Sequence, residues 1–192
     1  MSSAPNPGVE SQTYLARPDS PELAAAASLW KSAYIHIPFC LRRCPYCDFA
    51  IVDESTNGRD SVERYVEALI AEIEMESEFG PLDAINFGGG TPTRLEPAKL
   101  GSIVDALRVR FGAHDDVEIS LEANPEDWSD SLGDGLVDAG FTRVSVGAQS
   151  FDNGVLSALG RNHTADQISE TIGSARRVGF GSVSVDLIFG LP

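Results

Sequence analysis

The chain has 192 residues, 42% of them hydrophobic, which is enough for one globular domain with a sizeable core. Its formal net charge of −15 argues against nucleic acid or an anionic membrane as the main partner, because phosphates require a cationic surface. No apolar run approaches the length of a membrane span. The first thirty residues lack the basic region and apolar core of a secretory signal, so we expect a cytoplasmic protein.

Residues 1–30 are rich in Ser, Pro, Ala and Gly and show no clear hydrophobic period. We expect them to form a disordered lead-in, with a short helix over residues 21–30. Residues 31–192 are expected to form the core domain.

Strands and helices alternate through that domain. The expected strands are 33–38, 84–87, 117–121, 143–148 and 182–188. The expected helices are 60–79, 97–111, 129–139, 153–160 and 165–178, several of them followed by a glycine. This alternation predicts an α/β fold built from right-handed βαβ units around a parallel sheet.

Residues of alternating character in the strands distinguish two α/β architectures. Successive side chains of a strand point to opposite faces of the sheet. The residues on one face are apolar, and those on the other are polar or small, as in Tyr34 and His36 or in Glu118, Ser120 and Glu122. A doubly wound sheet is covered by helices on both faces and should be apolar on both. One polar face favours a partial (β/α) barrel of about five strands, whose lumen holds a ligand.

Polar and small residues also gather where the strands end. Gly88-Gly89-Gly90-Thr91 follows the second strand, Glu122 ends the third, Gln149 follows the fourth, and Asp186 lies near the end of the fifth. The carboxyl ends of parallel strands share one rim, where such barrels keep their sites. Glycines permit a ligand to approach the backbone, and Glu122 suits hydroxyl or amine groups. Arg161 suits a carboxylate, whereas His163 and His114 are interpreted as loop histidines.

The chain has three cysteines, Cys40, Cys44 and Cys47, spaced C-x3-C-x2-C after the first strand. An odd, tight cluster predicts a metal site and not a disulfide framework. One alternative is zinc, with His36 as the fourth ligand. The other is a four-iron cluster on three thiolates, which leaves one iron open to an external ligand. His36 is expected to point into the lumen, away from the loop, which favours the cluster.

Five separated motifs resemble the radical S-adenosylmethionine superfamily. They narrow the resemblance to the branch that contains oxygen-independent coproporphyrinogen III oxidase and the heme chaperone HemW. The motifs are Tyr34–Cys40 with the cysteine loop that follows, Gly88–Pro92, Val144–Phe151, Leu159–His163 and Asp186–Pro192.

The resemblance implies a 4Fe-4S cluster on the three cysteines, with S-adenosylmethionine chelating the open iron and yielding a 5′-deoxyadenosyl radical on reduction. Tyr34, Gly89 and Glu122 match contacts of this S-adenosylmethionine. Positions that hold a second S-adenosylmethionine in the oxidase are matched by Tyr46, Gly90, Thr91, Gln149, Arg161 and Asp186. The implied partners are heme or a porphyrin, an electron donor such as flavodoxin, and a protein that accepts heme.

Phe49 separates the two members of the branch. The oxidase has a further cysteine two residues past the third cluster ligand, and this chain has Phe49 there. We therefore expect a HemW-like heme chaperone, with coproporphyrinogen III oxidation as the alternative. Members of the branch are about twice as long, so we expect a truncated barrel with an open edge at the fifth strand and heme-binding residues beyond Pro192.

Overall fold

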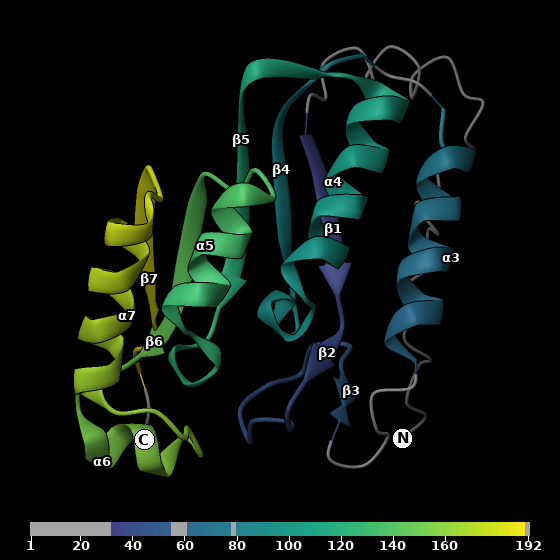
Figure 1. The fold of residues 1–192 in the computed structure, drawn as a ribbon. Coiled ribbons are helices and arrows are strands. Elements are labelled where there is room, and N and C mark those ends of the chain that lie inside the picture. The colour runs from purple at the N-terminus through teal and green to yellow at the C-terminus, as the bar shows by residue number, and fades with distance from the viewer. Residues whose placement is uncertain (1–31, 55–60, 78–79, 191–192) are drawn as a thin grey trace, which may run out of the picture. The chain divides into compact units, whose positions relative to one another are not determined.

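The computed structural model describes residues 32–54, 61–77 and 80–190 (Figure 1). The expected disorder of residues 1–30 and the helix expected over 21–30 lie outside these ranges. The sheet has five parallel strands in the order β1-β4-β5-β6-β7. They are β1 Ser32–Ile37, β4 Leu82–Gly89, β5 Ala113–Ala123, β6 Arg143–Gln149 and β7 Ser182–Leu187.

Helices cover one face of this sheet (Figure 1). They are α3 Val62–Met75, α4 Pro97–Phe111, α5 Asp130–Asp138 and α7 Ala165–Val178, while the short α6 spans Asn153–Ala158. Two 3-10 turns, η1 Pro92–Arg94 and η2 Pro125–Asp127, follow β4 and β5. None of the helices in the described ranges is long and apolar enough to cross a membrane.

Local signals explain where these helices begin and end. Pro97 lies in the first turn of α4, and Gly112 ends it with a φ of +74°, which a side chain would disfavour. Thr164 and Gln167 form a capping box at the start of α7, and Gly179 ends that helix in the left-handed conformation. The expected bounds of α4 and α7 are confirmed, because each signal lies at the helix end that it specifies.

The alternation of polar and apolar faces is confirmed for four strands and only partly for β7. The apolar side chains of β1, β4, β5 and β6 are buried beneath the helices. On β7, Val183 packs against the core, but Val185 and Leu187 are 37% and 57% exposed. Within the described ranges no helix follows β7, so nothing covers the outer half of that strand. The expectation that its apolar face packs on helices was wrong there.

The opposite face of the sheet is polar and open. It bears a cavity of about 360 Å³, lined by Asn86, Glu118, Ser120, Leu121, Glu122, Arg143, Ser145 and Asp186. In the described part of the chain, β1 and β7 each pair with one neighbour, so the sheet is not closed. The expected partial barrel is confirmed as an open sheet of five parallel strands with one polar face.

Candidate cofactor site

A cavity of about 150 Å³ lies at the carboxyl ends of the strands. It is lined by every predicted site residue except Tyr34, namely Cys40, Cys44, Tyr46, Cys47, Gly89, Gly90, Thr91, Glu122, Gln149, Arg161 and Asp186. The strands that carry these residues are parallel, so their carboxyl ends bring residues far apart in the sequence to one rim.

The cysteine loop is fastened at its base by a short strand pair that the sequence did not reveal. β2 Phe39–Cys40 pairs with β3 Val52–Asp53, and two residues are too few to show a period. His36 Nε2 lies 2.9 Å from the carbonyl oxygen of Ala50 and can donate to it. His36 therefore reaches the far end of the loop, so the expectation that it points away from the loop was wrong. It is not among the residues that line the cavity.

A buried ion-pair cluster, which we call the Arg94 clamp, ties three rim loops together. Arg94 donates from Nη2 to Glu54 Oε2 at 2.6 Å and from Nη1 to Asp127 Oδ1 at 2.8 Å. Glu54 follows β3 at the end of the cysteine loop, Arg94 ends η1, and Asp127 ends η2. The hydrogen bond from Arg94 to Glu54 is the main reason that the pKa of Arg94 is raised.

The glycine-rich turn fits closely against neighbouring backbone and side chains. A Cβ on Gly90 would lie within 2.8 Å of backbone atoms of Ile37, Pro38 and Phe39. Gly89 has a φ of +107°, and a Cβ there would meet the His36 ring at 2.4 Å. Both positions therefore require glycine, for close approach and, at Gly89, also for the backbone conformation.

Glu122 lies on the cavity wall, and Tyr34 stands beside it. Burial, and then the negative charge of Asp186, raise the pKa of the Glu122 carboxyl, although the backbone N–H of Gly89 donates to it. Tyr34 is 60% exposed on the polar face of the sheet, and its hydroxyl is 3.4 Å from His36 Nδ1. The structure thus places Tyr34 at the edge of the site and not on its wall.

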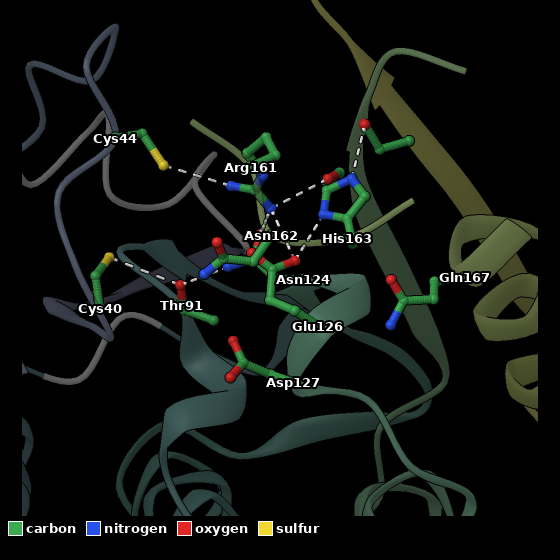
Figure 2. A network of polar contacts seen from close by, with 12 residues as sticks. Cys40, Cys44, Thr91, Asn124, Glu126, Asp127, Arg161, Asn162, His163 and Gln167 are labelled. Atoms are coloured by element: carbon green, nitrogen blue, oxygen red, sulfur yellow. Dashed lines mark hydrogen bonds and ion pairs between the residues drawn. The ribbon is translucent and has the colours of Figure 1, made fainter. Parts of the chain in front are cut away.

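A polar network connects two of the cysteines (Figure 2). Thr91 Oγ1 is 3.6 Å from Cys40 Sγ and accepts from Asn124 Nδ2 at 2.9 Å. Arg161 donates from Nη2 to Asn124 Oδ1 at 2.5 Å and from Nη1 to Cys44 Sγ at 3.6 Å. We call this series, from Cys40 through Thr91, Asn124 and Arg161 to Cys44, the sulfur network.

Glu126 bonds to Arg161, and His163 bonds to Glu126. Glu126 Oε2 is 3.3 Å from Arg161 Nη2 and 2.7 Å from His163 Nδ1, and His163 Nε2 is 3.1 Å from the carbonyl oxygen of Ala148. Burial raises the pKa of Glu126, but the hydrogen bond to His163 and the charge of Arg161 outweigh it, so the pKa is lowered. His163 belongs to a loop, as expected, yet it is buried and bonded at both ring nitrogens. The same expectation was wrong for His114, which lies in β5.

The remaining predicted residues line the cavity in distinct ways. Gln149 has a φ of +62°, an uncommon conformation for a residue with a side chain. Asp186 accepts from the Ser145 hydroxyl at 2.9 Å. Burial is the main reason that the pKa of Tyr46 rises to about 12, although the nearby Arg161 opposes it.

The donor set fits an iron–sulfur cluster. All three thiols are free and line one cavity. In the described ranges, no three His, Cys, Asp or Glu side chains are placed to hold one metal ion. A tetrahedral zinc site draws all its ligands around one atom, whereas each thiolate of a cluster binds a different iron. Arg161 Nη1 also directs a hydrogen bond at a cysteine sulfur, as occurs around such clusters.

Sequence reasoning missed several residues that shape the rim: Glu54, Arg94, Asn124, Glu126 and Asp127. Three of them lie within five positions of Glu122 in the string Ala123-Asn124-Pro125-Glu126-Asp127. That cluster of polar residues directly after a strand was an available signal. Arg94 and Glu54 gave no comparable signal, because their partners are 33 and 40 positions away in the sequence.

Comparisons with known proteins show the family of the chain. The sequence model of the radical SAM superfamily matches residues 34–192. The heme chaperone HemW of Lactococcus lactis is 38% identical over 84% of this chain and 41% of its own length. The oxygen-independent coproporphyrinogen III oxidase of Paracoccus denitrificans is 34% identical over 84% of this chain and 36% of its own.

A solved structure shows the same arrangement of strands and helices. Coproporphyrinogen III oxidase (HemN) from Escherichia coli, a radical SAM enzyme, superimposes with a TM-score of 0.78 at 32% identity. The match covers 88% of this chain and 40% of that one. The chain thus spans about two fifths of the length of the relatives it matches.

Proposed function

The chain belongs to the radical SAM superfamily, and on that premise we propose that its rim binds a 4Fe-4S cluster and S-adenosylmethionine. The observation that carries the proposal is the convergence of Cys40, Cys44 and Cys47 on one cavity. With three thiolates for four irons, one iron is left for an external ligand. The assignment of residues 31–192 to one core domain and a cytoplasmic location belong to the same proposal.

Each side of the cavity has a role in this proposal. When bound, the cluster supplies the electron that cleaves the sulfonium of S-adenosylmethionine. Glu122 offers a carboxylate to the amino group of that ligand. Gly89 has no side chain, so the ligand can approach the backbone there. Tyr34 contributes from the edge of the site. Tyr46, Gly90, Thr91, Gln149, Arg161 and Asp186 form the remaining wall, where the oxidase holds a second S-adenosylmethionine.

For the protein as a whole we propose a HemW-type heme chaperone that binds heme and passes it to an acceptor protein. Phe49 supports this choice, since it lines the cavity at the position where the oxidase has a further cysteine. Its side chain is 65% exposed, so no packing requirement accounts for a large apolar residue there. The second candidate is oxidation of coproporphyrinogen III, which the likeness to the oxidases supports.

The test is anaerobic reconstitution with iron and sulfide, followed by three measurements, the first two on this chain and the heme measurement on the protein as a whole. We expect about four irons per chain, an electron paramagnetic resonance signal that changes on addition of S-adenosylmethionine, and binding of heme without turnover. A colourless protein that retains zinc would overturn the cluster. Decarboxylation of coproporphyrinogen III with reduced flavodoxin, with matching release of 5′-deoxyadenosine, would favour the oxidase.

A further inference from the structure

Asn124 stands at the centre of the sulfur network and touches neither cysteine. Its side-chain amide lies between Thr91 and Arg161, which lie beside Cys40 and Cys44 respectively (Figure 2). Thr91 also lies within hydrogen-bond distance of Cys40 Sγ, and Arg161 of Cys44 Sγ. The orientation of one amide group therefore bears on two of the three candidate cluster ligands.

The chemistry of the partners fixes the orientation of that amide. A guanidinium carries donors and no acceptor, so the Asn124 oxygen has to face Arg161 Nη2 at 2.5 Å. The amide nitrogen then has to face Thr91 Oγ1 at 2.9 Å and donate to it. A flipped amide would set donor against donor at Arg161, so the direction of both hydrogen bonds follows from the residue types.

The direction of these bonds determines what Thr91 does. Its hydroxyl accepts from Asn124 and keeps one proton to donate, and Thr91 is only 4% exposed. Cys40 Sγ is 3.6 Å from the hydroxyl oxygen. Since a thiolate bound to iron can only accept, the hydroxyl donates to the sulfur. Asn124, together with Glu126 and the carbonyl oxygen of Gly147, likewise holds Arg161 Nη2, which leaves Nη1 directed at Cys44 Sγ.

We propose that Asn124 is a positioning residue that sets the reduction potential of the cluster by keeping Thr91 and Arg161 as donors to the sulfurs of Cys40 and Cys44. Hydrogen bonds to cluster sulfurs withdraw electron density and so favour the reduced state. This inference rests on the proposed cluster and adds a control of its potential.

The variant Asn124→Asp tests the direction of the network, because it preserves shape and removes the donor. Thr91 must then donate to the new carboxylate and no longer to Cys40. We expect the ratio of reduced to oxidised cluster at a fixed potential to fall about tenfold, equivalent to about 59 mV for a one-electron couple. Thr91→Val removes the same sulfur hydrogen bond directly and should lower the ratio as well.

A matched control separates the hydrogen bond from the added charge. Asn162 is exposed, lines the same cavity and accepts from Arg42 Nη2 at 2.7 Å, outside the sulfur network. Asn162→Asp adds the same charge, which solvent screens, so we expect a change of less than about threefold. In the Thr91→Val background, Asn124→Asp should shift the ratio by less than it does in the wild type, since the hydrogen bond is already absent.

The readout is an anaerobic redox titration followed by electron paramagnetic resonance, with iron and sulfide determined for each variant. Equal potentials in the wild type and Asn124→Asp would overturn the inference alone. So would a full additional shift in the Thr91→Val background. A wild-type chain that assembles no four-iron cluster would overturn the proposed function and this inference together.

Discussion

Replacing Arg94 by methionine is expected to lower the free energy of unfolding by about 3–5 kcal/mol, because it leaves two buried carboxylates without their cation. The side chains of Glu54 and Asp127 are 4% and 9% exposed, and Arg94 itself is 18% exposed. Burial at this level leaves little solvent to replace the lost hydrogen bonds. Methionine retains much of the apolar stem, so the loss reports the charge and not the volume.

The measurement is urea unfolding at pH 7, with the slope of the transition compared between variants. Arg143→Met is the matched control, since Arg143 and Glu118 form an ion pair of 3.7 Å with side chains 41% and 50% exposed. We expect this exposed pair to contribute about 0–1 kcal/mol.

Two further results bear on the reasoning about the Arg94 clamp. Adding Glu54→Gln and Asp127→Asn to Arg94→Met should recover much of the loss, because neutral side chains need no counter-charge. An Arg94→Met variant no less stable than Arg143→Met would refute the claim that the clamp holds the three loops together. It would show that the carboxylates are solvated when the arginine is absent.

Three further predictions concern the cavity wall. Burial and the charge of Asp186 raise the pKa of Glu122, so its ionised form opposes folding. Glu122→Gln should therefore increase the free energy of unfolding at pH 7. The gain should vanish below the ordinary pKa of a glutamate, about 4.5. Urea unfolding at pH 4 and pH 7 measures this, and an equal effect at both would contradict it. Gly90→Ala should weaken iron retention, because a Cβ there meets backbone atoms at 2.7–2.8 Å. Its control, Gly173→Ala, meets only the flexible end of a side chain at 3.3 Å inside α7 and should stabilise by up to about 1 kcal/mol. Phe49→Cys should change stability by less than about 0.5 kcal/mol, since the side chain is exposed; thermal unfolding checks this, and a larger loss would reveal packing by Phe49.

The sequence determined those features whose causes lie close together along the chain. Helix α4 begins at Pro97 and ends before Gly112 because the first turn and the last turn each have a local steric requirement. The parallel order of strands follows from their alternation with helices. The placement of most predicted site residues on one rim follows from the same rule, since strand ends share an edge.

Local sequence patterns did not predict strands of two residues, nor the exposure of a strand that no helix covers. The two-residue strands β2 and β3 have no period to detect. The exposure of Leu187 could not be predicted from an apolar strand, because burial depends on which helix lies over it. His163 could not be distinguished from an ordinary loop histidine, because its partners Glu126 and Ala148 belong to other segments.

By itself, the sequence determined that three cysteines, a glycine turn and a set of polar strand ends would share one rim, since strand alternation and residue spacing specify that much. Only the tertiary structure decided how the rim is held. Arg94 bonds to Glu54 and Asp127, and Asn124 bonds to Thr91 and Arg161. The partners are 33 to 40 positions apart in the sequence. A hydrogen bond forms only at a suitable distance and angle in space, and the linear sequence specifies neither for partners far apart along the chain.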